Sequence, residues 1–329
     1  MIELIIPAIV SCLVAFFVVF FMTPPLIKIL EKRNLTVKDV NKKEDVMIPR
    51  PGGPSIIVGI IASEIILYAF LQLNEILAII ITTFTAFVIG YVDDRQVKGA
   101  WFKPVALGFA AIPIILLGAY DSDLTFPLFG TVQIPILYLA LIIFMIPITG
   151  NTINSIDVLN GIASGFMVIA SFSLSICLFI LQNYEIAIVS LPLGFVSLAF
   201  YKYHKIPSKI FPGDSGALTL GAMYGAIAIV GNVEIIAAVA LLPAVINSFL
   251  FLSSVKRRRS SLIMKKPVEH TDDFRLKATN DKTAPITLVR LILAGGSLSE
   301  NQVGSAIFKL AIFSGILAII TAFMMGVSL

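Results

Sequence analysis

Residues 76–104 read ILAIIITTFTAFVIGYVDDRQVKGAWFKP. The apolar run at 76–92 has roughly the length that a helix needs to cross the hydrocarbon of a bilayer. It ends in the adjacent aspartates Asp93 and Asp94, and the next apolar run begins at Lys103-Pro104. The same alternation of apolar runs with short polar loops repeats along the whole chain, which predicts a protein that is embedded in a membrane.

Ten apolar runs are predicted to be transmembrane helices. The composition agrees with this, because 58% of the 329 residues are hydrophobic and only 13% are charged. We therefore expect an all-α integral membrane protein that forms a single polytopic domain over residues 1–329. The predicted spans are 3–24, 54–72, 76–92, 103–120, 135–150, 162–182, 186–202, 215–231, 235–255 and 306–327.

The distribution of positive charge predicts the orientation of these helices. All 24 Lys and Arg residues fall on one side of the predicted membrane. Because short loops rich in Lys and Arg stay in the cytoplasm, both termini should lie outside. The outer segment 121–135 has two short β-prone runs and is predicted to form a small hairpin after helix 4. The cytoplasmic loops are then 28–53, 93–104, 151–161, 202–216 and 256–305.

Composition also limits the partners of the chain. The net charge of +4 is explained by cytoplasmic loops that face anionic lipid or an anionic substrate, so no nucleic-acid partner is expected. Cys12 and Cys177 lie inside apolar runs and are expected to be buried small hydrophobic residues rather than a disulfide or metal ligands. We expect a multi-pass protein of the cell membrane whose active site faces the cytoplasm.

The second and fourth cytoplasmic loops contain acids next to helix ends. Adjacent carboxylates such as Asp93 and Asp94 repel each other near lipid, and a hard divalent cation would relieve that repulsion. Lys103 lies where a helix begins, which is a favourable place for phosphate. Asp214, in FPGDSG at 211–216, is suited to hold a metal that bridges phosphate oxygens, although it could also simply cap the following helix.

The first loop combines basic residues with a rigid turn. Lys38, Asp39 and Lys42 are suited to bind an anionic, hydroxyl-rich ligand. The prolines and glycines of IPRPGGP at 48–54 are expected to form a turn that presents backbone N–H groups. The alternative is that this loop only fixes the topology.

The third loop has no basic residue but has polar side chains at every third position. Asn151, Asn154, Asp157 and Asn160 would line one face of a tight turn, which Gly161 ends. Helix–helix hydrogen bonding is the alternative, but four groups in register favour a binding site.

The fifth loop contains the basic run 256–259, which is interpreted as a lipid and topology anchor. His270 and Arg275 are within reach of a substrate sugar or diphosphate, or they lie on a surface loop. The sequence contains neither a P-loop motif nor a recognisable Ser-His-Asp or Cys-His set.

Together, these motifs resemble the polyprenyl-phosphate N-acetylhexosamine-1-phosphate transferase family, which includes the dolichyl-phosphate GlcNAc-1-phosphate transferases and the MurNAc-pentapeptide translocases. The resemblance covers essentially the whole chain. Asp93-Asp94 and Lys103 fit the family's aspartates and its diphosphate-binding lysine. The segment 151–161 resembles NxxNxx(D/A)GxxG, with Val158 where Gly is usual, and 211–216 resembles F-x-G-D-(S/T), whose Asp binds Mg²⁺.

The resemblance implies that the chain transfers GlcNAc-1-phosphate from UDP-GlcNAc to a polyprenyl phosphate, releasing UMP, as a first membrane step of glycan assembly. UDP-GlcNAc is favoured as the donor because the His-rich segment of the MurNAc enzymes is absent: the chain has only His204 and His270. The cofactor would be Mg²⁺, or Mn²⁺; the partners would be the polyprenyl phosphate, the UDP-N-acetyl sugar and membrane lipids, and a homodimer remains open. The implied catalytic residues are Asp93, Asp94, Lys103 and Asp214; the metal ligands are Asp214, Asn154 and Asp94; and the substrate-binding residues are Lys38, Asp39, Lys42, Asn151, Asn154, Asp157, Asn160, His270 and Arg275.

Three alternatives remain open at this point. The donor could be another UDP-N-acetylhexosamine. A transporter for an anionic solute would place its acids and broken helices near the midplane of the membrane, whereas here they gather at one face. A prenyltransferase that acts on prenyl diphosphate would need further aspartates near Asp93-Asp94, which the sequence lacks.

Overall fold

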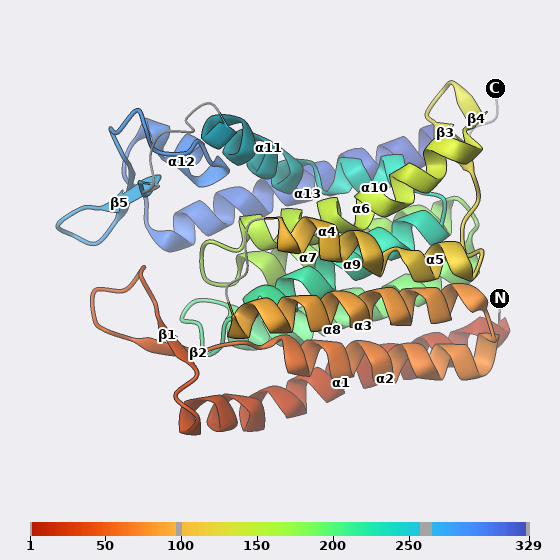
Figure 1. The fold of residues 1–329 in the computed structure, drawn as a ribbon, viewed down its shortest axis with the longest axis horizontal. Coiled ribbons are helices and arrows are strands. Elements are labelled where there is room, and N and C mark those ends of the chain that lie inside the picture. Colours follow the sequence, from red (N-terminus) through yellow and green to blue (C-terminus); the bar gives the residue numbers. More distant parts are fainter. Residues whose placement is uncertain (1, 97–100, 257–264, 327–329) are drawn as a thin grey trace.

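The computed structural model describes residues 2–96, 101–256 and 265–326, which form mainly helices (Figure 1). Three two-stranded antiparallel hairpins lie between helices in this part of the chain. The elements are α1 (Ile2–Lys32), β1 (Thr36–Lys38), β2 (Met47–Pro49), α2 (Gly53–Leu71), α3 (Asn74–Arg95), α4 (Phe102–Ala110), α5 (Ile112–Leu116), β3 (Asp123–Phe126), β4 (Gly130–Gln133), α6 (Pro135–Ile156), α7 (Ile162–Ile180), α8 (Tyr184–His204), α9 (Gly213–Val230), α10 (Glu234–Ala240), α11 (Leu242–Lys256), β5 (Val268–His270), β6 (Leu276–Ala278), α12 (Leu288–Ile292), the short 3₁₀ helix η1 (Leu293–Gly295) and α13 (Glu300–Gly326).

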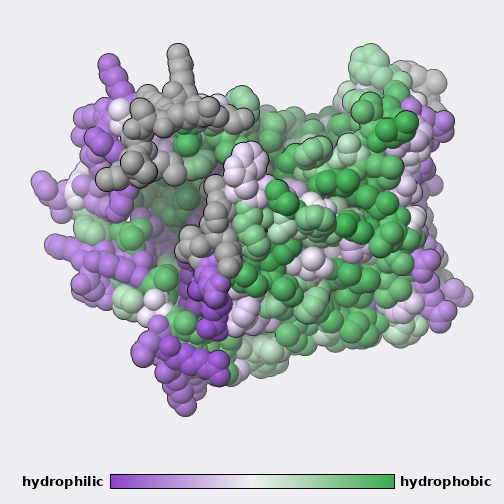
Figure 2. Space-filling view, in the orientation of Figure 1, coloured by the Kyte–Doolittle hydropathy of each residue, from purple (hydrophilic) through white to green (hydrophobic). Residues whose placement is uncertain are grey.

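The long helices run along one direction, so the loops gather at two opposite ends of the molecule (Figure 1). The start of α1 and the end of α13 lie at the same end as β3 and β4, while β1, β2, β5 and α12 lie at the opposite end. Figure 2 shows an apolar band over the middle of the molecule with hydrophilic residues at both ends. An apolar band of this kind is what a bilayer requires, and the chain is therefore a multi-pass membrane protein.

The described part of the chain contains fewer helices of membrane-crossing length than the ten predicted spans. Within the described ranges, eight helices are long and apolar enough to cross a bilayer: α1, α2, α3, α6, α7, α8, α9 and α13. The consecutive helices α10 and α11 meet at a bend of 76° and would make a ninth span if they cross together. The predicted span 103–120 consists of α4 and α5, which together form only a short apolar segment.

Proline explains why these two predicted spans are interrupted. Pro113 lies in the first turn of α5 and Pro243 in the first turn of α11. Proline has no N–H to bond to the preceding turn, and its ring clashes with that turn, so a helix that reaches it breaks or bends. Hydropathy alone cannot see these breaks because both segments are apolar throughout.

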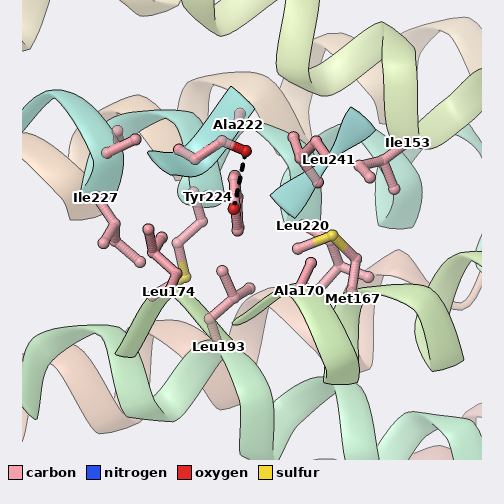
Figure 3. Packing of buried hydrophobic residues seen from close by; sticks show 14 of the residues in the cluster. Ile153, Met167, Ala170, Leu174, Leu193, Leu220, Ala222, Tyr224, Ile227 and Leu241 are labelled. Atoms are coloured by element: carbon pink, nitrogen blue, oxygen red, sulfur yellow. Dashed lines mark hydrogen bonds between the residues drawn. The ribbon is translucent and has the colours of Figure 1, made fainter. Parts of the chain in front are cut away.

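Helix α9 forms the centre of the bundle and packs against α3 and α6. Nearly all of its residues are buried, and many are Gly or Ala, which allow neighbouring helices to approach closely. Figure 3 shows side chains of α9, including Leu220 and Ile227, packed with Met167 and Leu174 of α7. The buried Tyr224 hydroxyl donates a hydrogen bond to the Ala237 carbonyl at 3.2 Å, which satisfies the polar atom in this apolar core.

A close approach between α3 and α9 positions the polar residues. A Cβ atom added at Gly90 in α3 would lie 2.6 Å from the Cα atom of Ser215 in α9, so only glycine fits there. This contact brings the end of α3, which carries Asp93 and Asp94, against the beginning of α9, which carries Asp214.

Local structure differs from the prediction in the third and first cytoplasmic loops. Helix α6 continues to Ile156, so Asn151 and Asn154 lie on its last turns and not in a loop. In the first loop, the N–H groups of Gly52 and Gly53 are not available to a ligand. They donate to the carbonyls of Phe211 and Pro212 at distances of 2.8 to 3.1 Å and fasten the first loop to the start of α9. In the segment 121–135, β3 and β4 form a two-stranded hairpin with Phe126 opposite Gly130.

Candidate active site

Lys103 lies between two carboxylates that come from different helices. Its ammonium nitrogen is 2.8 Å from Asp93 Oδ2 and 3.0 Å from Asp214 Oδ2. Asp93 is only 6% exposed, and the side chain of Asp214 is also largely buried. Two buried carboxylates repel each other unless a cation lies between them, and Lys103 supplies that cation.

Asp94 is occupied differently from its neighbour. Its Oδ1 accepts a hydrogen bond from the Asp214 N–H at 2.9 Å, and its Oδ2 accepts one from the Ser215 N–H at 2.8 Å. These are free N–H groups of the first turn of α9, so Asp94 caps that helix from another helix. Gly213 has a φ of +71°, and a Cβ atom there would lie 2.8 Å from Asp94 Oδ2, so a glycine is needed for the cap to close.

Arg50 adds a second cation to the cluster. Its Nη2 is 3.0 Å from Asp94 Oδ1 and 3.6 Å from Asp214 Oδ2. Two cations and three acids therefore meet where the first, second and fourth cytoplasmic loops come together. From the sequence, Arg50 was expected only to be part of the turn at 48–54.

A polar cavity of ≈ 300 Å³ opens beside this cluster. Asp214 lies on its wall together with Arg50 and Phe211. The remaining walls come from the first loop and from the segment that follows α6. Its predicted site residues are Lys38, Asp39, Asn154, Asp157, Asn160 and Asp214.

A hydrogen-bonded chain ties together three segments that are distant in sequence. The buried Asp39 accepts a hydrogen bond from the Asn160 side-chain amide at 2.8 Å. The Asn160 backbone N–H donates to Glu300 Oε1 at 3.0 Å, and Lys42 donates to Glu300 Oε2 at 2.8 Å. These bonds hold the first loop, the third loop and the start of α13 around the cavity. Lys42 does not line the cavity and is linked to the wall residue Asn160 through Glu300.

Asp157, His204 and Ser164 form a second polar chain. Asp157 Oδ1 lies 3.6 Å from His204 Nε2, and His204 Nδ1 lies 2.9 Å from Ser164 Oγ. A Ser-His-Asp set is not recognisable in the sequence, but the structure brings these three residues together. This set cannot act as a nucleophilic triad, because Ser164 is completely buried and His204 is 1% exposed. It instead connects α7 and α8 to the cavity wall.

Burial alters the pKa of Asp157, which lies on the cavity wall. Burial raises the pKa of Asp157 from 3.8 to about 7, although the Ala163 N–H, which donates to Oδ1 at 3.3 Å, opposes the shift. The pKa of this side chain is therefore close to neutral pH.

The residues on the wall are compatible with a magnesium ion. Among the described residues, no three His, Cys, Asp or Glu side chains converge as a metal site, in part because Asp94 faces the α9 amides. Asp214 and Asn154 both line the cavity, and the side-chain amide of Asn154 forms no hydrogen bond within the described part of the chain. Mg²⁺ is commonly bound by one or two carboxylates and completed by substrate phosphates and water. A carboxylate and an amide oxygen on one wall suit this pattern.

Four predicted substrate-binding residues lie outside the cavity wall: Lys42, which binds Glu300, and Asn151, His270 and Arg275. The Asn151 side chain donates to the Pro147 carbonyl of its own helix at 2.8 Å. His270 is exposed and stacks on Phe274 in the β5–β6 hairpin, and Arg275 binds the Ser297 carbonyl at 3.0 Å. The basic run 257–259 lies outside the described residues.

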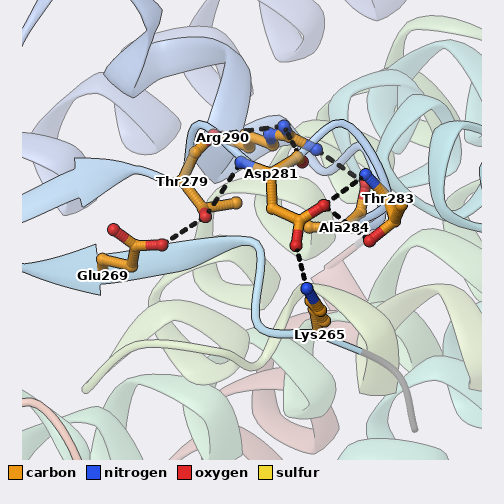
Figure 4. Close-up of polar contacts among 7 residues, drawn as sticks. All are labelled: Lys265, Glu269, Thr279, Asp281, Thr283, Ala284 and Arg290. Atoms are coloured by element: carbon orange, nitrogen blue, oxygen red, sulfur yellow. Dashed lines mark hydrogen bonds and ion pairs between the residues drawn. The ribbon is translucent and has the colours of Figure 1, made fainter.

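The fifth loop is held in shape by Arg290 (Figure 4). Its guanidinium donates to four carbonyls, those of Thr279, Asp281, Ala284 and Pro285, at distances of 2.7 to 3.2 Å. Asp281 also pairs with Lys265, and this ion pair lowers the pKa of Asp281. The described part of this loop, from residue 265 onward, therefore has a defined structure that carries β5 and β6 at this end of the bundle.

Sequence reasoning missed Arg50, His204, Phe211 and Glu300 as parts of the site. Arg50 and Phe211 lie inside motifs that were recognised for other residues. His204 and Glu300 lie at helix ends, where a charged residue is normal, so nothing in the sequence singles them out.

Comparison with known proteins gives consistent matches. Residues 76–232, which include Asp93, Lys103, Asn154 and Asp214, match the model of the family described as glycosyl transferase family 4. A protein of Saccharolobus solfataricus, provisionally named UDP-N-acetylglucosamine–dolichyl-phosphate N-acetylglucosaminephosphotransferase, is 32% identical over 249 residues, which cover 73% of this chain and 76% of that protein. A Sulfolobus acidocaldarius protein of the same name is 27% identical over 94% of both chains. The phospho-N-acetylmuramoyl-pentapeptide-transferase of Staphylococcus haemolyticus is 26% identical over 79% of this chain and 89% of its own length.

Proposed function

Because this chain belongs to the polyprenyl-phosphate N-acetylhexosamine-1-phosphate transferase family, we propose that it transfers GlcNAc-1-phosphate from UDP-GlcNAc to a polyprenyl phosphate of the dolichyl type. The products are polyprenyl-diphospho-GlcNAc and UMP. The observation that supports this proposal most directly is the Asp93–Lys103–Asp214 cluster beside a polar cavity at one end of an apolar bundle. A lipid phosphate and a water-soluble nucleotide sugar can meet at such a place.

The proposed reaction is a direct displacement at phosphorus. An oxygen of the lipid phosphate attacks the sugar-linked phosphorus, a new P–O bond forms, and the bond to UMP breaks as UMP leaves with the electron pair. A phosphate monoester has a second pKa near 6 and is largely dianionic at pH 7. The acceptor therefore hardly needs a general base, and Asp93 would serve mainly to orient it.

The cations of the site would balance the charge of the diphosphate. Lys103 would neutralise it, and Asp214 with Asn154 would hold Mg²⁺. Bound Mg²⁺ would supply positive charge that stabilises the developing charge on the leaving UMP. Because both oxygens of Asp94 already accept N–H groups of α9, we assign Asp94 to positioning Asp214 rather than to binding the metal.

The remaining wall residues would bind the rest of the donor. Lys38, Asp39, Asp157 and Asn160 would surround the uridine, with Lys42 supporting them through Glu300. The fifth loop would contact the N-acetyl sugar through the His270 and Arg275 region, which requires this loop to approach the cavity when the donor binds.

We further propose that the cavity faces the cytoplasm. The end of the molecule that carries it holds the loops rich in Lys and Arg, and such loops stay on the cytoplasmic side. On this assignment both termini and the β3–β4 hairpin face outward, and the α4–α5 segment and the bent α10–α11 pair supply the two remaining spans.

The proposal is tested by measuring UMP release in detergent from UDP-GlcNAc, polyprenyl phosphate and Mg²⁺. Asp214→Asn should lower the rate at least about 100-fold, because it removes the carboxylate that would hold Mg²⁺ at the diphosphate. Asp121→Asn, at an exposed position beside the β3–β4 hairpin at the opposite end of the bundle, is the matched control and should keep the rate within about twofold. Folded protein that releases no UMP with any UDP-N-acetyl sugar would contradict the transferase assignment.

Two further outcomes of the UMP-release assay would change the proposed donor or the proposed reaction path. UMP release from another UDP-N-acetyl sugar, but not from UDP-GlcNAc, would keep the reaction and change the donor. Exchange of labelled UMP into UDP-GlcNAc without any lipid acceptor would show a covalent intermediate and overturn direct displacement.

A further inference from the structure

A second cavity lies between the end of α8 and the first half of α13. Its volume is ≈ 360 Å³, and it shares one wall residue, Asn160, with the candidate active site. It contains none of the proposed catalytic residues. The donor and the reacting groups described above do not account for it.

Two lysines give this cavity its charge. Lys205 comes from the residue that follows α8, and Lys309 comes from the third turn of α13. No acidic residue lines the cavity, and within the described part of the chain neither lysine lies within 4.0 Å of a carboxylate. Two unpaired ammonium groups on one cavity attract an anion, since their own repulsion falls when a negative charge lies between them.

The face of α13 that borders the cavity changes from polar to apolar along its length. Asn301, Ser305 and Lys309 are exposed at intervals of four residues, which places them on one face of the helix. The same face continues with Ile312 and Ile316, which are each 51% exposed. Hydrogen-bond donors and charge at one end, followed by an exposed apolar strip, match the shape of a lipid whose head carries a phosphate.

The position in the bundle agrees with that match. The cavity lies near the start of α13, at the end of the bundle where the basic loops gather, and residues 312 and 316 follow farther along the helix toward the opposite end (Figure 1). Basic pockets between membrane helices on the cytoplasmic side are places where anionic lipid headgroups bind. Long Lys side chains also reach from an apolar helix surface toward the headgroups.

We propose that this cavity binds the phosphate headgroup of an anionic membrane lipid, with Lys205 and Lys309 on the phosphate and an acyl chain along Ile312 and Ile316. Asn160 joins this site to the donor cavity, because its backbone and side chain hold Glu300 and Asp39 in place. The site is separate from the transferase chemistry and does not depend on it.

The test is binding of phosphatidylglycerol to the purified full-length chain, followed by native mass spectrometry in a neutral detergent. At about 1 kcal/mol for each lysine near a phosphate, Lys205→Gln/Lys309→Gln should weaken binding roughly 30-fold. The matched control is Lys28→Gln/Lys202→Gln, which removes the same charge from exposed positions outside the cavity and should change binding less than about twofold. Lys205→Arg/Lys309→Arg keeps both charges and should retain binding, and a thermal midpoint of the Gln variant equal to that of the wild type shows that the Gln variant is folded.

Different results separate the sources of the phosphate. Phosphatidylglycerol should bind at least about tenfold tighter than the zwitterionic phosphatidylcholine, and inorganic phosphate should not displace it, because the acyl chain contributes part of the affinity. Equal loss in the two Gln variants would mean that only overall charge attracts the lipid, and the proposal would be wrong. Displacement by inorganic phosphate would assign the cavity to a small anion and overturn the lipid assignment.

Discussion

Lys103 is the cation that two buried acids of the candidate active site share. Its single charge is shared by Asp93 and Asp214, and both carboxylates are largely withdrawn from water. The lysine therefore allows the acids to be buried together, and in the proposed function it would also receive the anionic substrate.

Replacing this lysine should affect both activity and stability. Lys103→Gln leaves two buried carboxylates without their shared partner, so we expect a loss of about 3 kcal/mol or more in the free energy of unfolding. The UMP-release rate should fall roughly 100-fold or more. Lys103→Arg keeps the charge and should retain most of the stability. Lys202→Gln, at an exposed position of α8, should change neither the stability nor the rate. Thermal unfolding and UMP release measure the two effects, and full stability in Lys103→Gln would contradict the geometry.

Asp157 predicts a pH dependence. Its pKa is raised to about 7 in the folded chain from 3.8, so the folded chain holds this proton more tightly than the unfolded chain does. The resulting contribution to stability is fully present below about pH 4 and is lost as the pH rises through about 7. The thermal midpoint of the wild type should therefore fall between pH 5 and pH 8, and the fall should be smaller by a few degrees in Asp157→Asn, which cannot ionise. Identical falls in both proteins would refute this assignment.

At the residue scale, the sequence was enough to identify the acids of the candidate site, but not to predict which partner each acid binds. Asp93 and Asp94 are adjacent and chemically identical, yet one pairs with Lys103 and the other caps α9. Adjacent residues on a helix point in directions about 100° apart, so their partners depend on which neighbouring helix lies on each side. Only the packed structure contains that information.

At the scale of elements, the contact between α3 and α9 holds the site together. The backbones of the two helices touch at Gly90 and Ser215, one turn away from Asp93 and Asp94. Asp94 then closes the contact by capping α9. A change in the distance between the two helices would therefore move Asp214 away from Lys103.

Gly90→Ala tests this contact. The new Cβ atom would lie 2.6 Å from the Ser215 Cα atom, so the helices must separate, and we expect a loss of about 1–3 kcal/mol in stability together with reduced UMP release. Gly108→Ala in α4 is the matched control, since its Cβ atom would meet nothing closer than 3.6 Å. It should be neutral or slightly stabilising, because Ala favours a helix more than Gly does. Equal thermal midpoints for the two variants would argue against a tight α3–α9 contact.

Long apolar helices were predictable as elements, whereas their breaks were not. Eight of the predicted spans correspond to helices long enough to cross a bilayer, because hydropathy reports directly on burial in lipid. The interruptions at Pro113 and Pro243 depend on whether a proline breaks or merely begins a helix, and apolar composition does not decide this. Composition also misplaced the end of α6. The helix extends past residue 150, because polar Asn151 and Asn154 continue it where they face protein rather than lipid.

At the scale of the whole molecule, the polar groups are distributed unevenly between the two ends. The candidate active site, the second cavity and the Arg290 loop belong to one end, and the β3–β4 hairpin with both termini to the other. The charge pattern of the sequence predicted this asymmetry, because basic loops alternate with loops that lack Lys and Arg. It could not predict the cavities, which need contacts between loops far apart in the chain.

The proposed orientation can be measured with introduced cysteines. Native Cys12 and Cys177 are buried and should not react with a membrane-impermeant maleimide, so they provide an unreactive background. A cysteine at Thr131 in the β3–β4 hairpin should react in intact cells, while one at Asn41 in the first loop should react only after the membrane is opened. The reverse pattern would invert the topology and place the cavity outside.

The Glu300 link has a consequence for how the protein is made. This one carboxylate holds Lys42 and Asn160, so the wall of the donor cavity joins a loop made early in synthesis to the first residue of the last helix. A chain that is still being translated inserts its earlier helices while this wall is incomplete. The ribosome must therefore translate past Glu300 before this part of the wall can take its form.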